Sequence, residues 1–222
     1  MKRLTLLLAP SFSAPTLAAA GDPLMTVRGA PLLTDDLRAL SPAWKTAKGH
    51  WTIQDGALHG EEVTADHHPA TYRQALKLQD GVIQFEVQLD GAKSVALSLN
   101  DAGGHVARLI IDRQGFQARK DDHDHTGPDK ALAFQRVAVP IAAGTWHTVT
   151  VEILGDRMLA TLDGQSAAGT LSFGRAPLIG TLKTNLGLVV QGGAASFRNL
   201  NVWAATPNAA WQDPAASVQG GK

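Results

Sequence analysis

A side-chain alternation of period two runs through much of this sequence. It is clearest at residues 82–90, where apolar Ile83, Phe85, Val87 and Leu89 alternate with polar Gln84, Glu86, Gln88 and Asp90. Successive side chains of a strand point to opposite faces, so this pattern is typical of a strand with one buried face. The same alternation recurs at residues 95–99, 106–112, 149–153, 185–191 and 196–203. We therefore expect an all-β protein.

Turn signals separate these runs. Asp55-Gly56 divides residues 49–54 from residues 57–60, Gly155-Asp156 follows Leu154, and Asp163-Gly164 follows Leu162. Such dipeptides favour tight hairpins, and many short strands joined by hairpins form a sandwich or a barrel. The chain has 222 residues and 44% hydrophobic content, which suits one substantial core. We predict a single two-sheet antiparallel jelly-roll sandwich over residues 35–203.

The two ends of the chain differ from this pattern. Residues 1–20 contain Lys2 and Arg3, a short apolar run and three alanines before Gly21, which is the order of a cleavable signal peptide. This predicts a secreted or periplasmic protein. Residues 21–34 are expected to be an irregular lead-in. Residues 204–222 are rich in Ala, Pro, Gly and Gln, so we expect a disordered or loosely packed tail.

The composition limits the classes of molecule that the protein can be expected to bind. Removal of residues 1–20 leaves 18 basic and 20 acidic residues, a net charge of about −2, and no basic stripe of the kind that nucleic acid requires. There is no cysteine, hence no disulfide. No stretch approaches the roughly 20 apolar residues of a transmembrane helix. The expected partner is therefore neither nucleic acid nor the membrane interior.

Several segments together resemble the 3-keto-disaccharide hydrolase family. They are residues 51–60 (WTIQDGALHG), residues 82–99, residues 146–152 (WHTVTVE), Asp163-Gly164 and residues 197–203 (FRNLNVW). The resemblance covers roughly residues 35–203. It implies a concanavalin-like (LamG-like) jelly roll, of the kind often grouped with family 16 glycoside hydrolases. It also implies an exported carbohydrate-active protein that acts on a glycoside or keto-sugar at the concave face of the sandwich.

The sequence also limits the mechanism. Family 16 glycosidases resemble one another in a strand motif E-x-D-x-x-E, which places two carboxylates beside the scissile bond. Residues 86–90 here read EVQLD, so double-displacement hydrolysis is not expected. A 3-keto group acidifies the adjacent C–H bond, and one base with one acid would then suffice. The alternative is a non-catalytic, lectin-like module that binds carbohydrate or a surface partner through the same face.

One polar segment, residues 120–130 (KDDHDHTGPDK), could carry chemistry. Its His123 and Asp121 are candidate catalytic residues, and Lys120 and Asp124 are candidate substrate contacts. In an extended chain His123 and His125 project to one side, so the two imidazoles could hold a divalent metal. The competing interpretation is a solvated loop between strands, because charged runs are usually exposed.

Two further candidates lie on strands. Arg108 interrupts an apolar strand and needs a partner, either an internal carboxylate such as Glu86 or Asp112 or a ligand hydroxyl. With the preceding His105 it is a candidate substrate-binding residue. Glu86 is a third candidate catalytic residue, which lines a groove if its side of the strand is the concave face and otherwise meets water.

The tryptophans are the remaining candidates, because sugar C–H faces pack on exposed aromatic rings. Trp51, Trp146 and Trp203 fall at strand positions and are expected in the core. Trp44 and Trp211 do not fall at such strand positions, so they are less constrained to the core.

Overall fold

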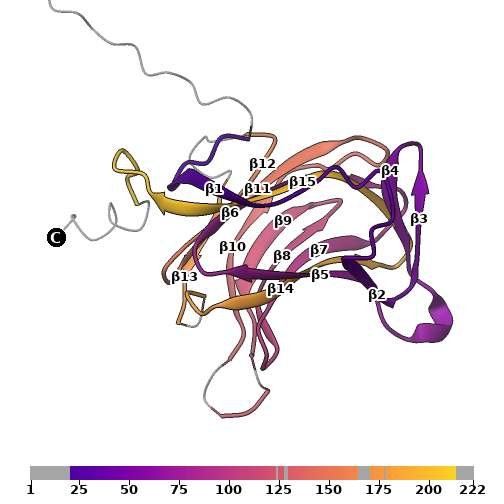
Figure 1. Cartoon of the computed structure of the whole chain (residues 1–222), viewed down its shortest axis with the longest axis horizontal. Helices are drawn as coiled ribbons and strands as arrows, with labels where there is room; N and C mark the ends of the chain where they lie inside the picture. The colour runs from indigo at the N-terminus through magenta and orange to yellow at the C-terminus, as the bar shows by residue number, and fades with distance from the viewer. Residues whose placement is uncertain (1–20, 124, 128–129, 165–170, 178, 214–222) are drawn as a thin grey trace, which may run out of the picture.

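The computed structural model describes residues 21–213 apart from residues 124, 128–129, 165–170 and 178. They form two stacked antiparallel sheets (Figure 1). One has eight strands, in the spatial order β13 (Ser172–Arg175), β12 (Arg157–Leu162), β11 (His147–Leu154), β6 (Gly81–Leu89), β15 (Ala194–Pro207), β4 (Ala57–Glu61) and β3 (His50–Gln54), with β1 (Thr26–Asp35) on the second half of β15. The other has seven, in the order β10 (Leu132–Ala138), β9 (Gly115–Lys120), β8 (His105–Asp112), β7 (Ser94–Asn100), β14 (Lys183–Gln191), β5 (Ala70–Leu78) and β2 (Trp44–Lys48).

The predicted jelly-roll sandwich is confirmed. Each alternating run is a strand, and the clearest one is β6, whose Ile83, Phe85 and Val87 are at most 1% exposed. Within the described residues the only helix is a 3₁₀ turn, η1 (Thr64–Asp66), and no helix is long and apolar enough to cross a membrane. The hydrophobic faces of both sheets therefore close on one another to form the core.

A chain of aromatic rings crosses the core between the sheets. Trp44 of β2 stacks on Tyr72 of β5 at 5.0 Å, and Tyr72 stacks on Trp51 of β3 at 5.1 Å. Trp51 then meets Phe197 of β15, which meets Phe85 of β6. Full burial of each such side chain contributes roughly 1.5–3 kcal/mol. Trp51 belongs to the core as expected. The expectation that Trp44 is not constrained to the core is wrong, because Trp44 is buried and its indole N–H donates to Asp35 Oδ2 at 2.8 Å.

Two of the predicted turn dipeptides form two-residue hairpins. Between β3 and β4, Asp55 has a φ of 49° and Gly56 a φ of 72°, the left-handed pair that a type I′ turn needs. Gly155-Asp156 joins β11 to β12 in the same two-residue manner, since Leu154 pairs directly with Arg157.

The expected ends of the domain need correction. Residues 26–35 are not an irregular lead-in but strand β1, which the sequence hides because Gly29 and Pro31 interrupt its alternation. Residues 204–207 belong to β15, and Trp211 packs against Phe173 beside a small second core. The expected signal peptide, residues 1–20, and the rest of the expected tail, residues 214–222, lie outside the described residues.

Candidate functional site

Strand register sets a row of polar side chains across the outer face of the seven-stranded sheet. Arg73 of β5 lies opposite Gly187 of β14, which lies opposite Ser98 of β7. Ser98 in turn faces Arg108 of β8, and Arg108 faces Arg119 of β9. Directly opposed residues share a face of the sheet, so three arginines and two small residues form one line.

A second row beside it carries neutral hydrogen-bonding groups. Asn100 of β7 donates its amide to Asn185 Oδ1 of β14 at 2.8 Å, and its own Oδ1 accepts from Ser98 Oγ at 2.9 Å. His105 Nδ1 lies 2.5 Å from the same Asn100 Oδ1. Because that oxygen only accepts, Nδ1 carries the proton, and Nε2 of the neutral ring is left with a lone pair.

The surroundings of His105 keep its ring neutral. Burial, followed by the positive charges of Arg108 and Arg73, lowers the pKa of His105 below its usual value, against an opposing effect of Asp121. His105 therefore offers an unprotonated nitrogen near neutral pH, next to two guanidinium groups.

Arg108 is fixed in place by a buried carboxylate. Its Nε donates to Asp121 Oδ2 at 2.9 Å and its Nη2 to Asp121 Oδ1 at 2.6 Å, while Asp121 is only 2% exposed. Arg119 Nε lies 3.1 Å from the same Oδ1 without hydrogen-bond geometry. The expected internal ion pair of Arg108 exists, but its partner is neither Glu86 nor Asp112. A bidentate pair of this kind orients the guanidinium while leaving Nη1 available.

These rows line three adjoining hollows, which we call the groove. The central hollow, about 170 Å³, includes Arg73, Ser98, His105 and Arg108. A hollow of about 220 Å³ shares Arg73 and His105 with it, and one of about 80 Å³ shares Arg108. The groove thus crosses β5, β14, β7 and β8, with its polar groups toward one end.

The predicted polar segment reaches only the rim of the groove. His123 Nε2 lies 2.6 Å from Asp101 Oδ1, and His123 packs against the Gly103-Gly104 turn that lines the groove. Partial burial alone would raise the pKa of Asp101, but hydrogen bonds from His123 and from the Gly103 and Gly104 amides lower it. The Asp101 carboxylate therefore closes this end of the groove as a paired anion.

The other residues of that segment are dispersed. His125 is exposed with a φ of 59°, and Asp124 lies outside the described residues. Lys120 is buried, because its side chain turns inward and its Nζ donates to the Lys130 carbonyl at 3.1 Å. In the part of the chain that the structure describes, no three His, Asp or Glu side chains gather as a metal site would need.

The three predicted catalytic residues do not meet. Glu86 lies on the outer face of the eight-stranded sheet, where its oxygens accept from Arg198 Nε and Asn199 Nδ2, both at 2.7 Å. Asp121 is occupied by Arg108, and His123 lies at the rim. The alternation predicted that Glu86 lies on the polar side of β6, but it could not predict which of the two sheets contains β6.

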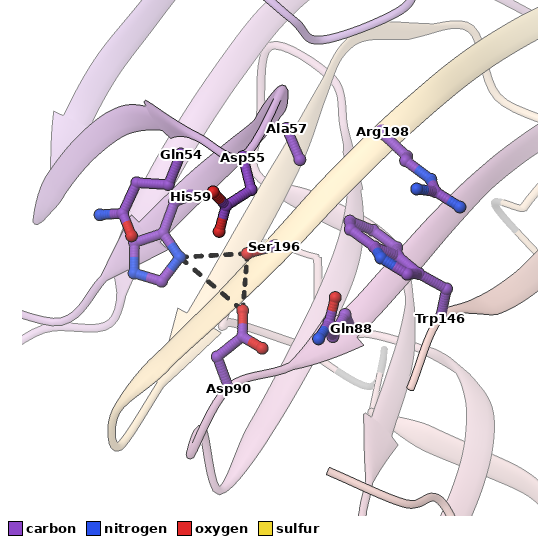
Figure 2. Close-up of a pocket in the computed structure, with 9 residues that line it drawn as sticks. All are labelled: Gln54, Asp55, Ala57, His59, Gln88, Asp90, Trp146, Ser196 and Arg198. Carbon is purple, nitrogen blue, oxygen red and sulfur yellow. Dashed lines mark hydrogen bonds and ion pairs between the residues drawn. The ribbon is translucent and has the colours of Figure 1, made fainter. Parts of the chain in front are cut away.

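A second hollow, of about 270 Å³, lies on the eight-stranded sheet (Figure 2). Trp146 lines it with Arg198 4.1 Å from its ring, so the expectation that Trp146 is a core residue is wrong. His59, Ser196 and Asp90 also meet there, but Ser196 donates to Asp90 Oδ2 at 2.6 Å, and the same His59 Nδ1 faces both. A serine nucleophile would need its proton directed to a histidine base, so this cluster is no such relay.

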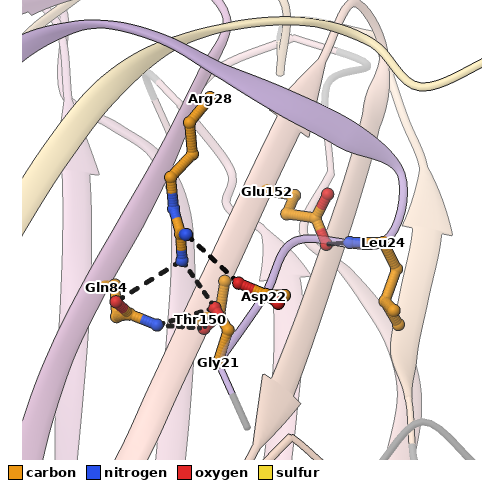
Figure 3. A network of polar contacts seen from close by, with 7 residues as sticks. All are labelled: Gly21, Asp22, Leu24, Arg28, Gln84, Thr150 and Glu152. Atoms are coloured by element: carbon orange, nitrogen blue, oxygen red, sulfur yellow. Dashed lines mark hydrogen bonds and ion pairs between the residues drawn. The ribbon is translucent and has the colours of Figure 1, made fainter. Parts of the chain in front are cut away.

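On the same face, the chain's own N-terminal segment, residues 21–26, lies against β6 and β11 (Figure 3). The Gly21 carbonyl accepts from Gln84, Arg28 and Thr150. Glu152, 1% exposed, accepts from the Leu24 and Thr26 amides at 2.8 and 2.7 Å. Burial raises the pKa of Glu152, and these bonds oppose the rise. Trp203, also expected in the core, is only half-buried and lies under Arg28.

Sequence reasoning found Arg108 and His105 but missed Arg73, Ser98, Asn100 and Asn185. Within residues 70–78 the alternation of buried Tyr72 with exposed Arg73 was a usable signal for an outward-facing arginine. The other three are ordinary polar residues, and only the pairing of β14 with both β5 and β7 brings them together.

No family model and no curated protein matches the sequence. Solved structures match the fold. The carbohydrate-binding module CBM66 from Bacillus subtilis has a TM-score of 0.56 at 16% identity, over 73% of this chain and 96% of its own. The Crh5 transglycosylase has 0.60 at 13%, over 86% and 92%, and the Bacillus licheniformis β-glucanase has 0.56 at 10%, over 79% and 98%. At these identities the chain is similar to them in its jelly-roll fold.

Proposed function

We propose that this protein binds a glycan in the groove on the outer face of the seven-stranded sheet. The observation that carries the proposal is the groove itself, an elongated depression with guanidinium, amide, hydroxyl and imidazole groups aimed outward from four rigid strands. Sugar hydroxyls both donate and accept, and a mixture of such groups can satisfy them. The jelly-roll neighbours include a carbohydrate-binding module and glycan-acting enzymes, which supports the same class of ligand.

The test is to fill the groove and measure binding to a panel of soluble glycans. Ala96 lies on the groove floor, half-buried, so Ala96→Trp would occupy the space without disturbing the core. Ala138→Trp, at an exposed position at the far end of β10, opposite Gly115 and outside the groove, is the matched control. We expect Ala96→Trp to lose binding by about tenfold or more and Ala138→Trp to keep it. Equal binding by both variants would place the glycan elsewhere.

A second candidate function is cleavage of a 3-keto-glycoside, the activity that the sequence resemblance implies. It is favoured by His105, a neutral imidazole with an open Nε2 beside Arg73 and Arg108. His105 would take the proton from C2, and the C–H electron pair would form the C2=C3 enolate. Collapse of the enolate would form the C1=C2 bond and expel the glycosidic oxygen, which gains a proton from water. The hydroxide so formed would add to C1 while His105 returns its proton to C2, which completes the hydrolysis. The arginines would stabilise the developing enolate oxygen.

Its test is release of the aglycone from a 3-keto-glucoside. We expect His105→Gln to abolish release and His125→Gln, at an exposed loop position, to preserve it. Absence of turnover by the parent protein, with or without added divalent metals, would leave glycan binding as the function.

Export is part of the same proposal. Residues 1–20 would be removed as a signal peptide, and the protein would meet its glycan outside the cytoplasm. N-terminal sequencing of protein from its native host should begin at or near Gly21, and an intact Met1 would contradict export by this route.

A further inference from the structure

The groove is unusual in the sign of its charges. The central hollow is lined by two arginines, Arg73 and Arg108, and by no Asp or Glu. Arg119 stands next in the row. The one carboxylate that these cations share, Asp121, is buried beneath them and 2% exposed. Three guanidinium groups against the buried Asp121 leave an excess of positive charge at the surface, because the groove's other carboxylate, Asp101, is held by His123 and by two backbone amides.

The two groove arginines have donors to spare. Arg108 uses Nε and Nη2 on Asp121, so Nη1 remains. Arg73 is exposed and makes no hydrogen bond or ion pair with any described residue. A charged side chain at a groove wall with no internal partner is free to pair with a ligand.

The groove floor between Arg73 and Arg108 is formed by residues with small side chains. Arg73 and Arg108 lie three strands apart, about 14 Å between backbones at the usual strand spacing, which two arginine side chains can bridge toward one bound group. Gly187 and Ser98 lie between them. A Cβ atom on Gly187 would stand 3.6 Å from Arg73 Cγ and 3.8 Å from Ser98 Cβ, so any larger side chain would enter this space.

From this juxtaposition we propose that the groove selects acidic glycans and holds the carboxylate or sulfate ester of one sugar between Arg73 and Arg108, above Gly187 and Ser98. This rests on the proposed glycan binding and names its ligand class. The lowered pKa of His105 agrees with a positive local field, to which Arg108 and Arg73 both contribute after burial. The hollow on the eight-stranded sheet differs, since Asp55 and Asp90 line it and its Arg198 is paired to Glu86.

The experiment compares one polymer in two charge states. Binding of the full protein to polygalacturonate and to its methyl ester is measured by calorimetry at roughly 0.1 M salt, so that diffuse attraction is screened. We expect the free acid to bind about tenfold more tightly than the ester. A sulfated galactan and its unsulfated parent form a second pair, which distinguishes a sulfate ester from a carboxylate.

Two variants locate the effect. Arg73→Gln should lose about tenfold in affinity for the acidic polymer and leave binding of its neutral partner unchanged. It should fold normally, because Arg73 has no internal bond to lose. The control is Lys77→Gln, which removes the same charge from the same face of β5, four residues further along and outside the groove. Less than a twofold change is expected there.

Each outcome decides between the proposals. Equal affinity for the charged and neutral polymers would overturn the acidic preference while glycan binding stands. Equal losses in the Arg73 and Lys77 variants would also overturn it, because the attraction would then be unspecific. Binding to neither polymer in either pair, nor to any glycan of the wider panel, would overturn both proposals.

Discussion

On the outer face of the eight-stranded sheet, Glu86 binds Arg198, Arg198 packs on Trp146, and Glu152 holds the N-terminal segment. On the outer face of the seven-stranded sheet, Arg73 has no internal partner among the described residues and Arg108 is bound on one side only. Both faces are built from strands with the same alternation. The comparison teaches that the location of a site follows from which polar groups the fold leaves unsatisfied, and charged residues alone do not reveal it.

The largest effect should come from the covered face. Glu152→Ala would leave the part-buried amide of Leu24, and the buried amide and hydroxyl of Thr26, without their acceptor. We expect the free energy of unfolding to fall by about 3 kcal/mol, because buried donors lose their partners without regaining water. Urea denaturation measures the loss, and glycan affinity should stay unchanged. A cost below about 1 kcal/mol would mean that the segment is held by other contacts.

Asp121 on the open face should couple stability to binding. Asp121→Asn removes the charge that orients Arg108, with an expected cost of about 2 kcal/mol in unfolding free energy. Affinity for the acidic glycan should fall about tenfold as well, because Arg108 is no longer held toward the groove. Retention of full affinity in a destabilised variant would show that Asp121 supports the fold alone.

The pH dependence of binding should distinguish the faces further. The pKa of His105 is lowered, so the ring is neutral at pH 7 and gains its proton only as pH falls below the ordinary value of about 6.5. A protonated His105 would add positive charge, and affinity for an acidic glycan should rise on the order of threefold as pH falls through that pKa. The glycan carboxylate stays ionised above about pH 3.5. Calorimetry at several pH values measures this. His105→Gln should reduce the rise, with any remainder due to His68, which lines the same hollow, and His125→Gln should keep the rise in full.

The smallest effect is expected for Trp146→Ala. It removes one cation–π contact with Arg198, which contributes about 0.5–1 kcal/mol at a partly exposed site. Glycan affinity should change less than twofold. A large loss of affinity would reverse the comparison and move the binding site to the hollow on the eight-stranded sheet.

Much of the fold was readable from the sequence because burial imposes a strict local period. Strand β6 shows it without a break from Ile83 to Leu89, and β7, β8, β11 and β14 show it well. Strands β1 and β10 did not show it. β1 contains Gly29 and Pro31, and β10 is an edge strand with only Phe134 and Val137 buried.

The site was readable only in part, because alternation assigns a side chain to a face of its strand and not to a sheet. Glu86 and Arg108 each lie on the polar side of a strand, yet they are on opposite surfaces of the sandwich. Arg108 needed a carboxylate, and residue type alone could not choose Asp121 over Glu86 or Asp112. The partnership of Arg73, Gly187 and Ser98 depends on pairings between segments about a hundred residues apart in sequence, for which the local pattern holds no information.

The last strand, β15, lies inside the eight-stranded sheet rather than at its edge. It pairs with β6 along both halves, with β4 along its first half and with β1 along its second. During synthesis, β1, β4 and β6 must therefore wait for residues 194–207 before any of them gains that neighbour. Nascent chains will expose unpaired strand edges until residues 194–207 have left the ribosome, and folding of this sheet is delayed until then.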